Sequence, residues 1–278
     1  MDNFVEKIFT LEGCPIHYWS GGKEGAPWLI FLHGACVDHH SFDPILPAFA
    51  EDYRVLAWDA RGHGLSQPMG KDFSVPVAVD DLLAIMEKEN IEQPVLIGHS
   101  NGTYIAQEMV FRHPGKARAL VVMDGTCITW PRSKFEMGYV KAAIGAFDWW
   151  PYENLKKSSL KYASRIKESQ DYEYRAFNML SRKDFVTIMK GISLCLHPEP
   201  DYRVRCPLMI LHGDDDRMGD IAKISPLWAK QDPNYMYWVV PNAGHLATLD
   251  NPAGVIDALK DFLKVVPDQG EKEKKADA

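Results

Sequence analysis

The feature that most constrains the fold of this chain is a series of short, nearly continuous apolar runs separated by stretches with helical periodicity. Strands that are buried on both faces of a parallel sheet have this continuous apolar character. The expected strands cover residues 4–9, 17–19, 28–32, 54–58, 95–98, 119–123, 208–212 and 236–240. Helical repeats lie between them, and the last helix is expected to begin at Pro252 with Asn251 as its N-cap. The alternation predicts an α/β fold, in which helices cover both faces of a mostly parallel sheet.

Two regions interrupt this alternation. Residues 127–205 contain no clear strand, and this stretch is too long for a loop between two strands. We therefore expect a helical insertion, or cap, that divides a core made of residues 1–126 and 206–267. The last residues, 268–278, are charged and contain no apolar side chain beyond alanine, which predicts a disordered tail.

Composition excludes several classes of partner. The net charge of −7 argues against nucleic acid and against an anionic membrane, because both need a basic protein surface. The sequence shows no apolar run of membrane-spanning length and no apolar signal-peptide core at its amino terminus. The five cysteines are scattered and form no CxxC pair, which favours reduced thiols over a disulfide framework. A cytoplasmic protein is expected, with no nucleic acid and no membrane among its partners.

The sequence GHSNG, at residues 98–102, places a serine between two glycines. The pattern alone is weak, because G-x-S-x-G occurs by chance in roughly one chain in ten of this length. Its context is more specific, since a strand is expected to end just before Ser100 and a helix to begin just after it. Small residues at Gly98 and Gly102 allow the sharp turn that exposes a nucleophilic serine. The alternative is a serine that only caps the helix.

A nucleophilic serine needs a base, and the base needs an acid that orients it. In this arrangement the acid follows the serine along the chain and the histidine follows the acid. The only histidine downstream of the acidic run 214–216 is His245, which follows the last expected strand. A loop there can bring His245 to the sheet edge at which Ser100 emerges. Three acids are left open at this point: Asp216, Asp214 and Asp124.

Several motifs together resemble the α/β-hydrolase superfamily, in particular its cap-bearing serine hydrolases and esterases. They are GHSNG, HGA at 33–35, DARGHGLS at 59–66, and GDDD at 213–216 followed by His245, and they occur in the superfamily's order. The resemblance covers about residues 28–126 and 206–265. It implies an α/β-hydrolase fold with a mostly parallel, eight-stranded sheet and a helical cap between strands 6 and 7.

The resemblance also implies roles for individual residues. The superfamily pattern G-x-x-D makes Asp216 the implied acid, with Asp124 and Asp214 as alternatives. The backbone N–H groups of Ala35 and Asn101 are the implied oxyanion hole. One departure is Thr103, where many relatives have a second glycine and where we expect modest crowding. No cofactor is implied. The pair His39 and His40 suggests a metal site, but adjacent histidines rarely bind one ion together, so we expect no metal.

The residues expected to line a substrate pocket are mainly aromatic, because the stretch 130–190 is about twice as rich in aromatic residues as the 11% of the whole chain. A helical cap with this composition would supply an apolar pocket. The candidates are Cys36, Phe42, Trp130, Tyr139, Trp149, Trp150 and Leu246. The same stretch has 12 basic and 7 acidic residues, which raises the hypothesis that the substrate carries a carboxylate.

The predicted function is hydrolysis of a small carboxylic ester or lactone through an acyl-enzyme intermediate, with Ser100, His245 and Asp216 as the catalytic residues. The same residues could perform C–C bond hydrolysis or hydroxynitrile cleavage. Epoxide chemistry is disfavoured, because such relatives carry Asp at the nucleophile position. A third hypothesis is a ligand receptor that keeps the three residues. The expected partner is a small molecule, and no sequence feature indicates an oligomeric state.

Overall fold

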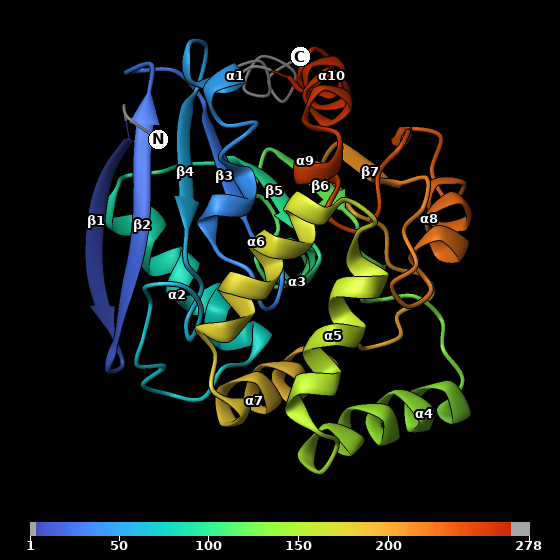
Figure 1. The fold of residues 1–278 in the computed structure, drawn as a ribbon. Coiled ribbons are helices and arrows are strands. Elements are labelled where there is room, and N and C mark those ends of the chain that lie inside the picture. Colours follow the sequence, from blue (N-terminus) through green and yellow to red (C-terminus); the bar gives the residue numbers. More distant parts are fainter. Residues whose placement is uncertain (1–3, 268–278) are drawn as a thin grey trace.

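The strands of the chain form one sheet, which we describe from a computed structural model of residues 4–267 (Figure 1). Within this described part, the eight strands are β1 (Phe4–Leu11), β2 (Cys14–Gly22), β3 (Trp28–Leu32), β4 (Arg54–Trp58), β5 (Val95–His99), β6 (Ala119–Met123), β7 (Leu208–Gly213) and β8 (Tyr235–Val240). Their order across the sheet is β1-β2-β4-β3-β5-β6-β7-β8. The predicted tail, 268–278, lies outside the described residues.

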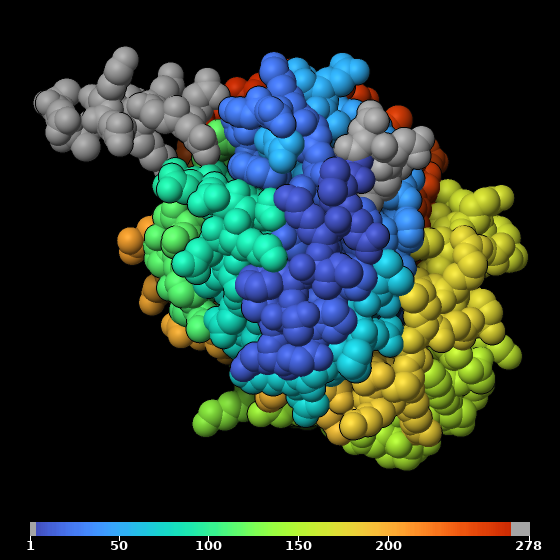
Figure 2. Space-filling model, turned by 90° about the vertical axis from the view of Figure 1, so that its left-hand side faces the viewer, coloured from blue at the N-terminus to red at the C-terminus, as the bar shows by residue number. Residues whose placement is uncertain are grey.

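The sheet is parallel from β4 to β8, whereas β1 and β2 run antiparallel at one edge. Figure 2 looks onto this edge and shows β1 at the surface. The expected α/β-hydrolase sheet is therefore confirmed. The strand expected at 17–19 is longer than predicted, because Pro15 and the Gly21–Gly22 end obscure its apolar pattern while pairing with both neighbours holds it extended.

Helices cover both faces of the sheet. One core cluster packs α2 (Val75–Lys88), α3 (Asn101–Arg112) and α8 (Ile221–Ala229) against one face. The other packs η1 (His39–Phe42), α1 (Pro47–Ala50), α9 (Ala247–Asp250) and α10 (Pro252–Leu263) against the opposite face. Neighbouring residues of one strand alternate between the clusters, as Leu29 and Ile30 do on β3.

Helix α10 begins where the sequence predicts. The Asn251 side chain accepts a hydrogen bond from the Gly254 N–H at 3.0 Å, and Pro252 is the first helical residue. Because proline lacks an N–H, it loses no hydrogen bond at this position. The apolar side chains of α10, which follows the N-cap residue Asn251, pack onto the sheet.

The residues between β6 and β7 form the helical segment 127–205. It contains α4 (Lys134–Gly145), η2 (Ala146–Asp148), α5 (Tyr152–Ala163), α6 (Lys167–Asn178) and α7 (Arg182–Ser193). Figure 1 shows these helices at the end of the sheet toward which the β4 arrow points, and Figure 2 shows them bulging from one side of the molecule. Among residues 4–267, no helix has both the length and the apolar character needed to cross a bilayer.

The chain reverses direction across the sheet between β3 and β5. It passes from β3 outward to β4, and then returns across to β5 on the other side of β3. In open α/β sheets, such a switch point leaves a crevice beyond the carboxyl ends of the two strands. Ser100 and the loop that follows β3 meet there.

Candidate active site

The turn between β5 and α3 holds Ser100 in a strained conformation, with φ 50° and ψ −116°. Non-glycine residues rarely adopt positive φ, and such strain is frequent at functional sites. Both flanking glycines are required by close backbone contacts. A Cβ on Gly98 would lie 2.5 Å from the Gly102 carbonyl oxygen, and one on Gly102 would lie 1.9 Å from that of Leu32. The turn can therefore form only with small residues at both positions.

Thr103, the departure from the superfamily pattern, is accommodated by a neighbouring glycine. A Cβ on Gly125 would lie 2.2 Å from the Thr103 Oγ1, so the absence of a side chain there makes room for the threonine. The Thr103 hydroxyl donates a hydrogen bond to the Ser100 carbonyl oxygen at 2.7 Å. Thr103 thus adds a contact to the turn.

His245 lies between Ser100 and Asp216. Its Nε2 is 2.8 Å from the Ser100 Oγ, and its Nδ1 is 3.1 Å from the Asp216 Oδ2. The other Asp216 oxygen accepts a hydrogen bond from the Met218 N–H at 2.9 Å. When Nδ1–H donates to the carboxylate, the lone pair of Nε2 faces the serine hydroxyl. This arrangement can transfer the serine proton to the imidazole.

The two alternative acids have other partners. The Asp124 Oδ1 accepts from the Gly213 N–H at 2.9 Å, and the Asp214 Oδ1 accepts from the Ala243 N–H at 3.1 Å. Burial, together with the charge of Asp216, raises the pKa of Asp124 well above its usual range. Burial opposes ionisation of Asp216 too, but the charge of His245 and its hydrogen bond lower the pKa of that carboxyl. Asp216 is therefore the ionised acid that contacts His245.

The pKa of His245 is set by burial and by the surrounding carboxylates. Burial alone would lower this pKa, whereas the charge and hydrogen bond of Asp216, with smaller effects of Asp124 and Glu173, raise it above the usual value. The pKa of His99 shifts in the opposite direction, because burial and the charge of His245 lower it to about 3. Although its Nε2 lies 3.8 Å from an Asp124 oxygen, the His99 ring is thus neutral, and its Nε2–H donates to the His245 carbonyl oxygen at 2.6 Å.

The loop after β3 is held against the turn that carries Ser100. A Cβ on Gly34 would lie 2.9 Å from the His99 Nδ1 and 3.1 Å from the Ser100 Cβ. The His33 Nδ1–H donates to the Gly34 carbonyl oxygen at 2.7 Å, and its Nε2 accepts from the Ala60 N–H at 2.9 Å. Burial lowers the pKa of His33, so its ring stays neutral in this one tautomer. The bracing positions the next residue, Ala35, at the wall of the cavity.

The DARGHGLS loop is tied into the scaffold. Asp59 accepts hydrogen bonds from the backbone and ring of His39 and from the Leu65 N–H. The buried Arg61 forms a bidentate pair with Asp81, with N–O distances of 2.6 and 2.9 Å. His39 and its neighbour His40 each bond a carboxylate, and within residues 4–267 no group of three possible ligands could hold a metal ion.

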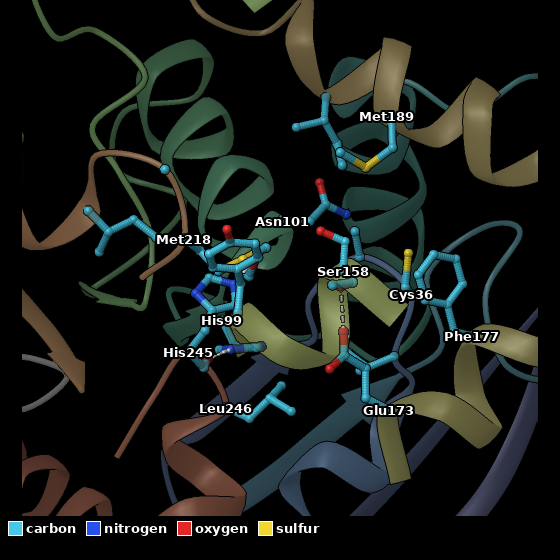
Figure 3. Close-up of a pocket in the computed structure, with 18 of the residues that line it drawn as sticks. Cys36, His99, Asn101, Ser158, Glu173, Phe177, Met189, Met218, His245 and Leu246 are labelled. Atoms are coloured by element: carbon cyan, nitrogen blue, oxygen red, sulfur yellow. Dashed lines mark hydrogen bonds between the residues drawn. The ribbon is translucent and has the colours of Figure 1, made fainter. Parts of the chain in front are cut away.

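A cavity of about 370 Å³ opens beside Ser100 and His245 (Figure 3). Its wall comes from the turn that carries Ser100, the loops after β3 and β7, and helices α5 to α7. Two of the predicted pocket residues, Cys36 and Leu246, line it. The aromatic residues in the wall are Tyr104, Phe147, Tyr162, Phe177 and Phe185.

Five predicted pocket residues do not line this cavity. Phe42 is fully buried in the core, where its ring packs edge-on against Phe31. Trp130 packs against the other core cluster. Tyr139, Trp149 and Trp150 point to solvent, with exposed fractions of 71%, 72% and 47%. Aromatic content alone was misleading here, because Tyr139 lies on α4 and Trp149 and Trp150 follow η2, and neither of these two helices buries a residue.

The cavity also holds polar side chains that sequence reasoning missed. The amide of Asn101 is buried, and neither of its polar atoms has a hydrogen-bond partner within residues 4–267. Glu173, on α6, is 4% exposed and lines the same cavity. The helical spacing could have predicted that Glu173 is buried. Ser169, Glu173 and Phe177 lie at positions i, i+4 and i+8, on the buried face of α6.

The helical segment 127–205 is tied to the loop that carries His245. The His245 N–H donates to the Ala163 carbonyl oxygen at 2.7 Å. Asp250 accepts hydrogen bonds from the hydroxyls of Ser164 and Ser169, at 2.7 and 2.6 Å, and from the Gly244 N–H at 2.9 Å. The end of α5 and the start of α6 therefore help to hold the histidine loop.

With this geometry in view, comparison with known proteins assigns the class. The model of the family described as "Alpha/beta hydrolase family" matches residues 29–258. The chain belongs to this family, and several of its relatives are named as esterases or hydrolases.

Among curated proteins, the chain is similar to the "Putative esterase/lipase" of Haemophilus influenzae, with 25% identity over 85% of this chain and 83% of that protein. It is also similar to epoxide hydrolase 3 of Xenopus tropicalis, with 24% identity over 91% and 75%. Among solved structures, a thermophilic esterase from Thermogutta terrifontis superposes with a TM-score of 0.78 at 19% identity, over 95% of this chain and 98% of that one. This last likeness is one of fold.

Proposed function

We propose that this protein is a serine hydrolase that cleaves a small carboxylic ester or lactone through an acyl-enzyme intermediate. The observation that carries the proposal is the contact of the Ser100 Oγ with the His245 Nε2 at 2.8 Å, with Asp216 on the other side of the ring. A serine without such a base is a weak nucleophile.

In the proposed reaction, Ser100 attacks the carbonyl carbon while His245 takes its proton. The imidazolium is stabilised by Asp216 and then donates the proton to the leaving alcohol. Water, deprotonated by His245, releases the acyl group. The N–H groups of Ala35 and Asn101 stabilise the oxyanion, in keeping with their place in the cavity wall and with Asn101 as the first residue of α3.

The nucleophile type favours ester chemistry over epoxide opening. The sequence has a serine hydroxyl at residue 100, where epoxide-cleaving relatives carry an Asp carboxylate. The similarity to an epoxide hydrolase is therefore a similarity of family, and the esterase-like relative agrees better with Ser100.

We further propose that the helical segment 127–205 is a cap inserted into a core made of residues 1–126 and 206–267. Its support is that α5, α6 and α7 contribute cavity wall opposite the nucleophile turn. A mostly apolar cover of this kind excludes water and strengthens the electrostatic interactions within the site.

The direct test is hydrolysis of a chromogenic short-chain ester, together with labelling by a serine-directed phosphonate. The wild-type protein should turn over the ester and take up one label on Ser100, located by peptide mass spectrometry. Ser100→Ala should lose roughly 10⁴-fold or more in kcat and remain unlabelled. Ser66→Ala is not a suitable control, because Ser66 anchors the DARGHGLS loop. Ser181→Ala, at an exposed residue that starts α7 and lies outside the cavity wall, is the matched control. Turnover retained in Ser100→Ala would contradict the proposal.

A further inference from the structure

Glu173 is a carboxyl group at the cavity wall that has only part of its hydrogen bonding satisfied. The side chain projects from α6 into the cavity, on the side opposite Met189 (Figure 3). One oxygen, Oε1, accepts a hydrogen bond from the Ser159 hydroxyl of α5 at 2.7 Å. The other, Oε2, is buried and has no hydrogen-bond partner within residues 4–267.

The contacts within the fold do not explain why this carboxyl is buried with one oxygen lacking a hydrogen-bond partner. No Lys, Arg or His of the described chain forms an ion pair with it, and the cavity wall contains neither Lys nor Arg. Burying an unpartnered polar atom is unfavourable, and native proteins rarely keep one without a reason. Burial also raises the pKa of Glu173, although the Ser159 hydrogen bond and the charge of His245 oppose this. A bound molecule would supply the missing partner.

The surroundings of Glu173 indicate the kind of group that would bind. Apolar side chains, including Leu155 and Phe177, make up most of the wall, and the hydroxyls of Ser158 and Ser159 lie in it as well. A substrate carboxylate would meet the carboxyl of Glu173 with no lysine or arginine in the wall to offset repulsion. The basic residues that suggested an anionic substrate thus lie outside the cavity wall. An uncharged hydroxyl, by contrast, can donate to Oε2 without bringing a charge into this apolar space.

We propose that Glu173 is a specificity-determining residue, whose Oε2 accepts a hydrogen bond from a hydroxyl group on the chain of the substrate. The inference rests on the proposed ester hydrolysis and defines its substrate class as hydroxylated esters or lactones. Ser159 is a positioning residue, because its hydrogen bond to Oε1 holds the carboxyl in one orientation.

The test uses two matched series of esters of graded chain length. One series has p-nitrophenyl esters of acyl chains that end in methyl, hydroxyl, ammonium or carboxylate, and the other has acetates of alcohols with the same four ends. At the chain length that reaches Glu173, the hydroxyl compound should exceed the methyl compound in kcat/KM by roughly 10- to 100-fold, the range expected for one hydrogen bond to a buried polar group.

The variants separate hydrogen bonding from charge. Glu173→Leu should bring the hydroxyl-to-methyl ratio of kcat/KM close to one, whereas Glu173→Gln, which keeps an acceptor oxygen, should retain most of it. Glu168→Leu and Glu168→Gln are the matched controls, since Glu168 is exposed on the same helix, and both should keep the wild-type ratio.

Other outcomes would overturn the inference. A preference for the ammonium end that is lost in Glu173→Gln would make Glu173 a cation site, and an unchanged ratio in Glu173→Leu would remove its role. If the wild-type protein hydrolyses methyl-ended esters with no hydroxyl preference at any length, this inference fails while the proposed function stands.

If no ester is turned over, the proposed function fails, and calorimetric binding of the same esters to Ser100→Ala and Ser100→Ala/Glu173→Leu still tests Glu173. Tighter binding of the hydroxyl compound that depends on Glu173 would support the hydroxyl site. Equal affinities in the two proteins would reject it.

Discussion

The carboxyl edge of the sheet and the helical segment 127–205 both line the cavity, but they are built differently. At the sheet edge, Asp216 and His245 are buried, and backbone contacts leave no space for a side chain at Gly98 or Gly102. Helix α3 at the sheet edge buries nine residues, whereas in the helical segment α4 buries none, α5 two, α6 four and α7 five. Under the proposed function, the rigid backbone of the sheet edge would position the reacting groups, and the less buried helical segment would select the substrate.

The largest effect is expected at the sheet edge, from Asp216→Asn. The amide cannot stabilise the imidazolium and favours the wrong tautomer of His245, so kcat should fall roughly 10⁴-fold. Asp124→Asn is the matched control: it keeps the acceptor for the Gly213 N–H and should change kcat only a few-fold. Steady-state kinetics on one chromogenic ester compares the two. A greater loss in Asp124→Asn would make Asp124 the acid.

Gly102→Ala tests how tightly the sheet edge is packed. Its Cβ would lie 1.9 Å from the Leu32 carbonyl oxygen, so α3 must shift, and we expect a loss of about 1–3 kcal/mol in the free energy of unfolding. Gly138→Ala on α4 is the same substitution in the helical segment, where a Cβ would meet nothing within 4 Å. It should stabilise by about 0.5–1 kcal/mol, because alanine is the better helix former. Urea unfolding measures the free energy of unfolding of both variants. Equal changes in the two would show that the sheet edge is packed no more tightly than α4.

The pH dependence tests the electrostatics of the sheet edge. Because the carboxylates raise the pKa of His245, the protonated ring, which cannot accept the serine proton, persists above the usual histidine value of about 6.5. We expect kcat/KM to be full above the raised pKa and to fall about tenfold per unit as the pH drops below it. A profile of kcat/KM against pH locates the midpoint. One at or below 6.5 would show that the carboxylates do not act in this way.

The smallest effects are expected from aromatic residues of the helical segment. Phe177 is buried at the cavity wall, so Phe177→Leu should alter the relative kcat/KM of short and long acyl chains by roughly tenfold. Trp149 is 72% exposed, and Trp149→Leu should leave that ratio within about twofold. The same ester series measures both variants. A change in Trp149→Leu as large as in Phe177→Leu would mean that the exposed aromatics also contact substrate.

Much of the fold could be predicted because its signals are local. The strands β3, β4 and β6 have the predicted bounds, since each contains a nearly continuous apolar run. The antiparallel β2 was the least accurate, because pairing with strands distant in sequence holds residues that have little strand character of their own. Neighbour contacts of this kind leave no pattern in the sequence.

The candidate site divides in the same way. The sequence could predict three site residues, Ser100, His245 and Asp216. Each follows a predicted parallel strand, and the carboxyl ends of such strands meet at one edge of the sheet. Most residues of the cavity wall could not be predicted, because composition shows which residues are aromatic but not toward which side a helix directs them. Trp149 and Trp150 face solvent, while Phe177 and the unexpected Glu173 face the cavity.

The sequence by itself determined the order of strands and helices, the sharp turn at Ser100 and the two small residues that the turn requires. Those features depend on backbone conformation and on apolar periodicity, which neighbouring residues encode. Only the tertiary structure decided which of three acids contacts His245 and which carboxyl in the cavity wall keeps one oxygen without a hydrogen-bond partner among residues 4–267. Both depend on distances between segments far apart in the chain, and these distances arise only when helices and sheet pack together.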